Sequence, residues 1–120
     1  MNVAWILQGL LAITFAGSGI RKLVKTREDL RVRGGSMAWL DEFGTWQMRT
    51  IGALEVLGAV GLVIPTLTGV LVFLTPLAAG GLFLMMLGAW VTHMRRGEFG
   101  AAIPSVALGT MALWVIVLRL

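Results

Sequence analysis

The sequence predicts an all-α fold: an integral membrane four-helix bundle with a short interfacial helix between the first and second spans. Hydrophobic residues make up 58% of the 120 residues and charged residues only 13%, about half the share usual in soluble domains. The mean hydropathy of +0.88 is equally hard to reconcile with a surface that faces water. Three stretches, residues 1–20, 56–92 and 99–118, contain no charged side chain. The length predicts a single domain, residues 1–120.

Each uncharged stretch is long enough to cross a bilayer, which takes about 20 mostly apolar residues. The stretch 56–92 is too long for one crossing and is interrupted by the turn-like residues Pro-Thr-Leu-Thr-Gly at 65–69. Because an open loop cannot lie in hydrocarbon, we expect helices rather than barrel strands. The predicted spans are residues 2–24, 48–64, 68–93 and 100–118, with an interfacial segment at 25–47.

The basic residues predict the orientation. Nine of the ten Lys and Arg residues flank the first connection or lie in the third, and the tenth is Arg119. Short cytoplasmic loops are enriched in Lys and Arg, so both termini are expected outside the cytoplasm. The first span lacks a basic start and a small-x-small cleavage site, so we expect it to be retained. The net charge of +4 does not indicate a nucleic-acid partner, because the basic residues lie between apolar runs.

The connection 25–47 carries aromatic residues at helical spacing. Ser36 can cap a short helix on which Trp39, Phe43 and Trp46 share one face. One interpretation is a helix in the cytoplasmic headgroup layer. The other is that these aromatic side chains pack beneath the bundle.

Cysteine and histidine counts exclude several kinds of chemistry. The chain has no cysteine, so it forms no disulfide, dithiol redox pair or thiolate metal site of its own. One histidine and one membrane glutamate do not make a metal site, and we expect no metal.

Glu55 is the one charged side chain well inside an apolar run. It lies six residues beyond Arg49, about 9 Å deeper at a rise of ~1.5 Å per residue. Intramembrane carboxylates are costly and face a bundle interior or a water-filled cavity. Glu55 is therefore a candidate proton relay, ligand anchor or acid–base group. The structural alternative is a protonated or paired glutamate that joins helices.

Lys22 and His93 are candidate partners of Glu55, because both close helices that run toward the cytoplasm. Inward faces would place Lys22, Glu55 and His93 around one polar pocket in the cytoplasmic leaflet, lined beside Glu55 by glycine and Leu62. The alternative for Lys22, which we favour, is an anchor whose ammonium group reaches the headgroups. Ser18 is then the donor for Glu55. His93, close to Arg95, has a surface position as its alternative.

Small residues in the second and third spans predict close helix packing. They are Gly52, Ala53, Gly58, Ala59 and Gly61, followed by Ala78, Ala79, Gly80, Gly81, Gly88 and Ala89. Besides the lipid bilayer, the candidate partners of these faces are a membrane or redox protein and a second copy of the chain.

Four blocks of sequence resemble the DoxX family of small bacterial four-helix membrane proteins. They are Phe-Ala-Gly-Ser-Gly-Ile-Arg-Lys-Leu (15–23), Ile-Gly-Ala-Leu-Glu-Val-Leu-Gly-Ala-Val-Gly-Leu (51–62), Pro-Leu-Ala-Ala-Gly-Gly-Leu (76–82) and Thr-His-Met-Arg-Arg-Gly-Glu (92–98). The resemblance implies a bundle in the bacterial inner membrane. The family name is linked with a subunit of a thiosulfate:quinone oxidoreductase, which implies a quinone as the cofactor to consider. Glu55, Lys22 and His93 carry over only as motif positions.

Three functional hypotheses follow. The first is a quinone-linked, redox-associated subunit whose Glu55 pocket holds or protonates an apolar ring. The second is a non-catalytic scaffold or assembly protein. The third is a small proton-coupled exporter, which we rank last because such exporters tend to carry their glutamate in the first helix and show weak charge bias.

Overall fold

The computed structural model describes residues 3–31 and 43–120. Four long helices, α1 (Val3–Val24), α3 (Thr45–Thr68), α4 (Leu74–Arg95) and α5 (Phe99–Arg119), are joined by turns and by the short helix α2 (Arg27–Arg31). All four are long and apolar enough to cross a membrane. The predicted all-α four-helix membrane bundle is therefore confirmed.

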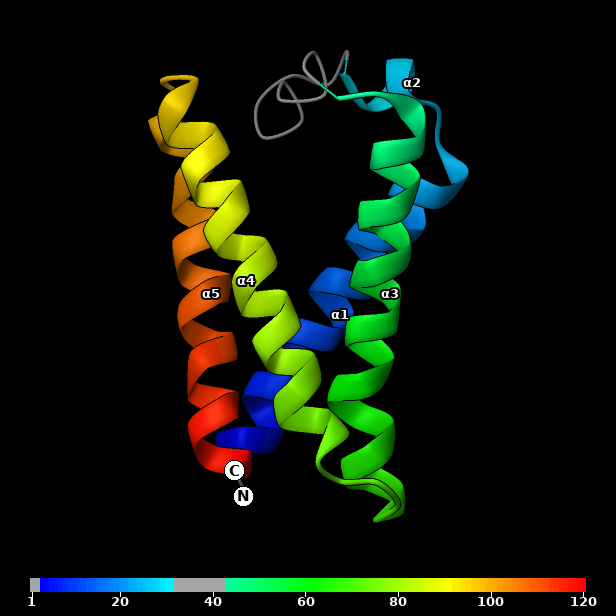
Figure 1. The fold of residues 1–120 in the computed structure, drawn as a ribbon, viewed down its shortest axis with the longest axis vertical. Helices are drawn as coiled ribbons and strands as arrows, with labels where there is room; N and C mark the ends of the chain where they lie inside the picture. The colour runs from blue at the N-terminus through cyan, green and yellow to red at the C-terminus, as the bar shows by residue number, and fades with distance from the viewer. Residues whose placement is uncertain (1–2, 32–42) are drawn as a thin grey trace.

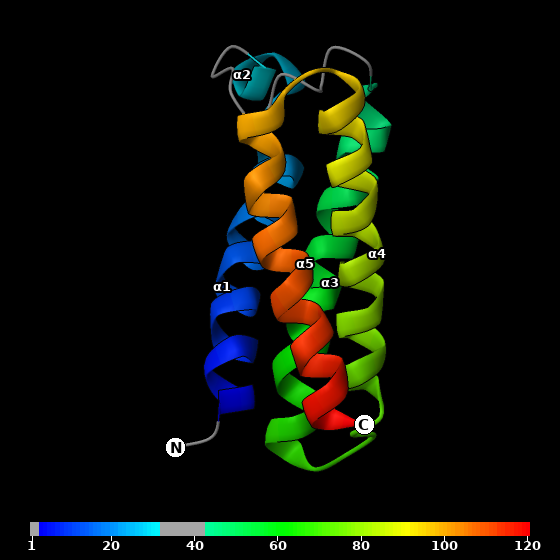
Figure 2. The same cartoon turned by 90° about the vertical axis from the view of Figure 1, so that its left-hand side faces the viewer.

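The helices pack as two pairs. Helix α1 packs along α3, and α4 packs along α5, whereas contacts between the pairs are sparser. Figure 1 shows the pairs close together at the end that holds both chain termini and spread apart at the other end. Figure 2 shows both termini at the same end of the bundle. We call this the terminal end, and we call the opposite end, with the Lys- and Arg-rich connections, the basic end.

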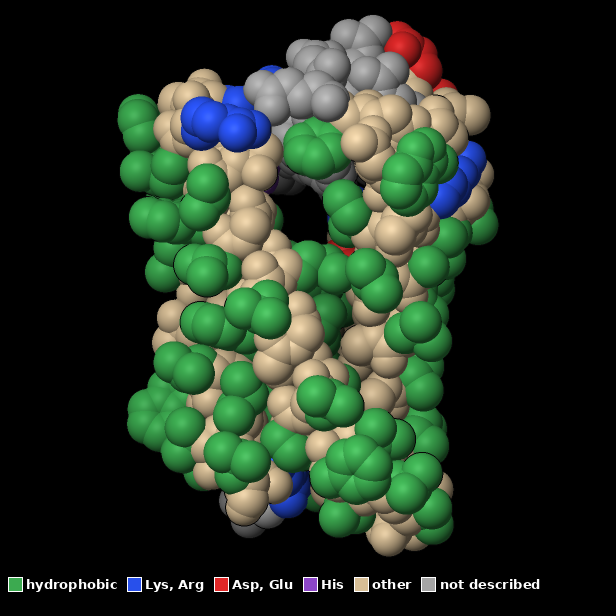
Figure 3. All heavy atoms as spheres, in the orientation of Figure 1, with side chains coloured by type: hydrophobic (Ala, Val, Ile, Leu, Met, Phe, Trp, Pro, Cys, Tyr) green, Lys and Arg blue, Asp and Glu red, His purple; other side chains and the backbone are tan. Residues whose placement is uncertain are grey.

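A continuous apolar core joins all four long helices. Its fully or nearly buried members are Leu11, Phe15, Ala59, Leu62, Ala79, Leu82, Ala112 and Val115. Large hydrophobic side chains also cover the outside of the bundle, as Figure 3 shows on one face. A soluble domain does not expose such a continuous apolar surface, but lipid solvates it. The chain is a multi-pass membrane protein whose outer surface suits the bilayer.

The α1/α3 pair is close because two glycines face each other. A Cβ atom built on Gly19 would lie 2.5 Å from the carbonyl oxygen of Gly52, and one on Gly52 would lie 2.8 Å from that of Gly19. The prediction of close packing at glycine is confirmed for Gly52, and also for Gly58 and Gly61, where an added Cβ would lie 2.7 Å from Leu82 and 2.8 Å from Ala78 of α4. It is wrong for Gly80, Gly81 and Gly88 of α4, which have no atom of another described segment within 4 Å of an added Cβ. Gly88 instead borders the open space between the helix pairs.

A chain of hydrogen bonds crosses all four long helices at the terminal end. Arg119 of α5 donates from Nε to Gln8 Oε1 on α1, over 2.7 Å. The Gln8 amide donates to the Leu62 carbonyl and, over 3.4 Å, to Thr66 Oγ1 on α3. Thr66 Oγ1 in turn lies 2.7 Å from Thr75 Oγ1 on α4. Because buried polar groups that find partners specify one arrangement, this network fixes the two pairs together at this end.

Helix α3 is longer than predicted at both ends. Its first turn follows Gly44, whose backbone N–H donates to Gln47 Oε1. At the other end α3 continues through Pro65 to Thr68, so the turn lies at residues 69–73 and not at Pro65. Pro65 removes only its own N–H donor, while its carbonyl accepts from Gly69 N–H over 3.0 Å. Gly69, at φ +73°, then ends the helix in the left-handed conformation.

The first connection contains a short helix, but at an unexpected position. Helix α2 covers Arg27–Arg31, and the Thr26 hydroxyl accepts from Asp29 N–H over 3.0 Å at its start. Ser36 and Trp39, on which the predicted interfacial helix depended, lie outside the described residues. Phe43 precedes α3 and Trp46 belongs to its first turn, so these two do not share a separate helix. The extended backbone of Gly44 separates them.

Candidate functional site

A pocket of about 500 Å³ opens between the two helix pairs at the basic end. Figure 3 shows an opening there, between the two helix pairs. The volume lies in the range of small-molecule sites, roughly 300–1,000 Å³. Its walls come from α1, Phe43, α3, α4 and α5: Thr14, Phe15, Ser18, Arg21, Lys22, Phe43, Ile51, Glu55, Met85, Met86, Gly88, Ala89, Thr92, His93, Ala101, Pro104, Ser105 and Leu108.

An ion pair forms the polar part of the α1/α3 wall. Lys22 Nζ lies 2.6 Å from Glu55 Oε1 and also donates to Ser18 Oγ over 2.6 Å. Lys22 is only 6% exposed and Glu55 only 3%. The favoured expectation that Lys22 reaches outward to the headgroups is therefore wrong. Close packing explains this, because a Cβ on Gly52 would lie 2.8 Å from Lys22 Cβ, so the lysine lies directly against α3.

Arg49 holds the end of α1 against α3. Its Nη1 donates to the Lys22 carbonyl over 2.7 Å and to the Lys25 carbonyl over 2.8 Å. The last carbonyls of a helix have no partner within the helix and carry partial negative charge, so a guanidinium group there is favourable. Arg49 thereby fixes the backbone that carries Lys22.

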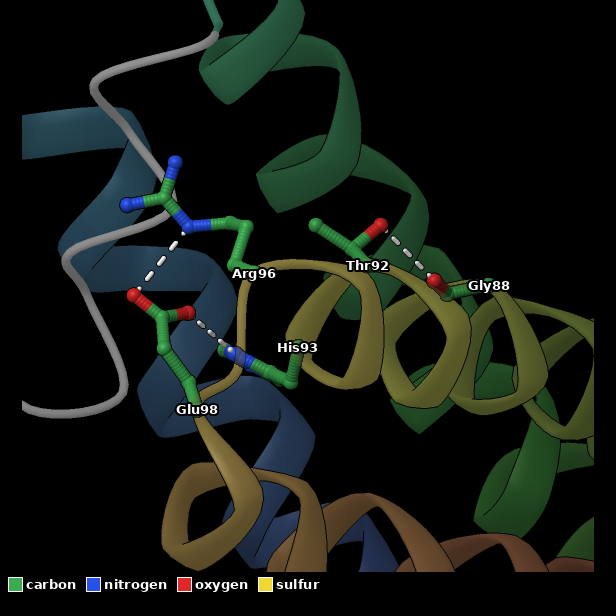
Figure 4. A network of polar contacts seen from close by, with 5 residues as sticks. All are labelled: Gly88, Thr92, His93, Arg96 and Glu98. Atoms are coloured by element: carbon green, nitrogen blue, oxygen red, sulfur yellow. Dashed lines mark hydrogen bonds and ion pairs between the residues drawn. The ribbon is translucent and has the colours of Figure 1, made fainter.

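His93 lies on the opposite wall, where α4 ends. Figure 4 shows its ring directed at Glu98, with Nδ1 3.0 Å from Glu98 Oε1, while Arg96 Nε lies 3.1 Å from Glu98 Oε2. Gly97 makes this possible: at φ +73° it reverses the chain, and Glu98 N–H bonds to the His93 carbonyl over 2.8 Å. Burial works to raise the pKa of Glu98, but the hydrogen bonds from His93 and Arg96 outweigh it and hold the pKa below its ordinary value of 4.5.

The threonines of the pocket contribute little polarity. Thr14 donates its hydroxyl to the Leu10 carbonyl over 2.8 Å, and Thr92 donates to the Gly88 carbonyl over 2.9 Å. Each hydroxyl is thus satisfied by its own helix. The other polar residues of the pocket are Ser18, Arg21, Lys22 and Glu55 on one wall and His93 and Ser105 on the other.

The structure brings the four predicted residues to one pocket, but not into one cluster. Ser18, Lys22 and Glu55 are in contact, whereas His93 pairs with Glu98. The expected glycine and Leu62 lining beside Glu55 is wrong. Leu62 is fully buried in the apolar core, and the lining that α1 and α3 contribute includes Phe15, Ser18 and Ile51 but no glycine.

Sequence reasoning missed three polar residues of the site. Ser105, only 6% exposed, lines the pocket from α5, and Arg21 lines it from α1. No local pattern distinguishes this serine from others in an apolar span. Glu98 was detectable, because a glycine one residue before it is the usual signal that a helix end turns back on itself.

One comparison with known proteins finds a match, to a family model. A family model described as the DoxX-like family matches residues 6–115, nearly the whole chain. The matched range includes Ser18, Lys22, Glu55 and His93. Comparison with curated proteins and with solved structures finds no match to this chain.

Proposed function

This chain belongs to the DoxX-like family, and from that premise we propose that it binds a flat, apolar ring of the quinone class in the pocket between its helix pairs, as a quinone-linked subunit of a redox assembly. The observation that carries the proposal is the buried Lys22–Glu55 pair at the wall of a pocket of about 500 Å³. Charged groups inside a membrane protein mark functional sites because their burial is costly.

The chemistry of the pair suits a ring that carries oxygen. An ammonium group has three N–H donors; Lys22 directs one to Ser18 and one to Glu55, which leaves one for a carbonyl oxygen. The second carboxylate oxygen of Glu55 has no partner among the described residues and can accept from a hydroxyl group. Phe15, Ile51 and Leu108 supply apolar walls for the ring. The protein's part is to bind and orient the ring, and a partner protein supplies the electrons.

The same proposal places the protein in the bacterial inner membrane, with both termini outside the cytoplasm and the pocket in the cytoplasmic leaflet. Nine of the ten Lys and Arg residues support this orientation, because along the sequence they flank the first connection or lie at the third. A ring dissolved in the lipid could then enter between the separated helix pairs without passing through water.

A non-catalytic scaffold protein is the second candidate function. Gly80 and Gly81 of α4 favour it, because no other described segment approaches an added Cβ at these positions within 4 Å. Small residues in lipid-facing positions let another helix approach closely. A partner protein or a second copy of the chain would use this face, and such a role would not require the pocket.

The proposal is tested with purified protein in lipid nanodiscs. We expect a quinone to co-purify, detected by mass spectrometry of the lipid extract. We also expect 1,4-naphthalenediol, a reduced quinone whose hydroxyls can donate to Glu55, to bind in isothermal titration calorimetry without oxygen. Glu55→Gln should keep the fold but weaken binding about five- to tenfold, the value of one hydrogen bond. Thr50→Val is the matched control on the same helix, because the Thr50 hydroxyl bonds to the Trp46 carbonyl outside the pocket.

Two results would contradict this function. Absence of both a co-purified quinone and measurable binding by the wild-type protein would remove the quinone class. Full-strength binding by a well-folded Glu55→Gln variant would remove Glu55 from the site and favour the scaffold.

A further inference from the structure

The two ends of the bundle differ in how the helix pairs are held together. At the terminal end, hydrogen bonds run from Arg119 through Gln8 and Thr66 to Thr75, and so connect both pairs. At the basic end, the polar side chains of the pocket bond within their own pair. Lys22 bonds to Ser18 and Glu55 in the α1/α3 pair, and His93 bonds to Glu98 at the start of α5.

The pocket therefore has a polar group on each of two opposite walls and an apolar space between them. One wall offers an N–H of Lys22 and an oxygen of Glu55. On the other wall, Nδ1 of His93 donates to the Glu98 carboxylate, so Nε2 of the neutral imidazole carries the lone pair and can accept from a ligand hydroxyl; Ser105 lines this wall as well. A ligand that satisfied only one wall would leave the polar groups of the other buried without a partner, which is costly.

We infer that the ligand bridges the two helix pairs as a reduced quinone, with a hydroxyl group on each of two opposite edges of a flat apolar ring. One oxygen meets Lys22 and Glu55 on the α1/α3 wall, and the other meets His93 and Ser105 on the α4/α5 wall. This inference rests on the proposed function and deepens it, since it assigns the α4/α5 wall a part in recognition. Bound in this way, the ligand connects the two helix pairs at the basic end, as the hydrogen-bond network connects them at the terminal end.

Glu98 is a positioning residue in this arrangement. Its carboxylate holds Nδ1 of His93 at 3.0 Å and is itself held by Arg96 at 3.1 Å, so the imidazole ring is fixed in orientation. A ring fixed by a carboxylate at one nitrogen presents the other nitrogen in a single direction. Rotation of His93 away from the pocket would break this contact.

The test compares two ring compounds that differ by one oxygen. 1,4-Naphthalenediol has hydroxyls on opposite edges, whereas 1-naphthol has one. In titration calorimetry without oxygen, with protein in nanodiscs, we expect the wild type to bind the diol about five- to tenfold more tightly than 1-naphthol, the value of one hydrogen bond. The variant Ser105→Ala and the variant His93→Gln should each reduce this preference.

Thr110→Val is the matched control, because it removes a hydroxyl from the same helix as Ser105. The Thr110 hydroxyl donates to the Val106 carbonyl over 2.8 Å, is exposed, and lies outside the pocket. This variant should keep the full preference for the diol. Ser105→Ala changes one small side chain, so it tests the part of the α4/α5 wall in ligand preference even if His93→Gln disturbs the fold.

The outcomes separate the bridging ligand from quinone binding itself. Equal affinity of the wild type for both compounds would overturn the bridging arrangement but not ring binding itself. An unchanged preference in both single variants, Ser105→Ala and His93→Gln, would do the same. Failure of the wild type to bind either compound would overturn both. A preference that falls in the two wall variants and persists in Thr110→Val supports the bridge.

Discussion

Removal of Glu55 should destabilise the bundle more than removal of any other single polar side chain of the pocket. Lys22 is 6% exposed and lies 2.6 Å from the carboxylate, so Glu55→Ala leaves its ammonium group buried with Ser18 as the remaining partner. Breaking a buried ion pair by removing one partner costs about 3–5 kcal/mol. Glu55→Gln keeps the shape and an acceptor oxygen, so its cost should be about 1–3 kcal/mol.

A double-mutant cycle isolates the pair from these single costs. Lys22→Met keeps the length of the side chain without its charge, and the Lys22→Met/Glu55→Gln variant contains neither charge. Because no unpaired charge is then buried, we expect the double variant to be more stable than the sum of the single changes predicts, by at least about 1 kcal/mol. The free energy of unfolding is measured by denaturant titration in detergent micelles, followed by far-UV circular dichroism.

Additivity of the two changes within about 0.5 kcal/mol would refute this reasoning, because it would mean that Lys22 and Glu55 do not stabilise each other. A Glu55→Ala variant as stable as the wild type would refute it as well. Either result would show that water or lipid headgroups solvate the two side chains in the bilayer.

Three further predictions concern packing, pH and topology. Gly19→Ala should destabilise the bundle by about 1–3 kcal/mol in the same titration, because its Cβ would lie 2.5 Å from the Gly52 carbonyl oxygen. Gly17→Ala, with nothing within 4 Å, should cost nothing, and equal losses would contradict close approach as the cause. The pKa of Glu98 is below its ordinary 4.5, so its stabilising charge should be complete above about pH 4.5 and lost as the pH falls below it. In Glu98→Gln, the free energy of unfolding should fall less between pH 4.5 and lower pH than it does in the wild type. The same pH dependence in both proteins would contradict this role of Glu98. A reporter fused after Leu120 should be active only outside the cytoplasm, and cytoplasmic activity would reverse the orientation.

The number and character of the helices follow from the sequence alone. Uncharged stretches of about 20 residues leave few alternatives in a membrane, since each backbone polar group must find its partner inside a helix. The same local reasoning identified Glu55, because a carboxylate in an apolar run must face the interior. It failed at Pro65, whose effect on a helix depends on which carbonyl and which N–H remain paired, and α3 continues past it to Thr68.

The partners of the polar residues were decided by tertiary structure. Lys22 could have reached the headgroups, but the contact of Gly19 with Gly52 brings α1 so close to α3 that Glu55 is within its reach. His93 could have joined this pair, yet the two helix pairs separate at the basic end and the turn at Gly97 brings Glu98 to it instead. A side chain's own helix fixes its depth and its face. Which residue it meets depends on the distance between helices, and that distance is set by packing across the whole bundle.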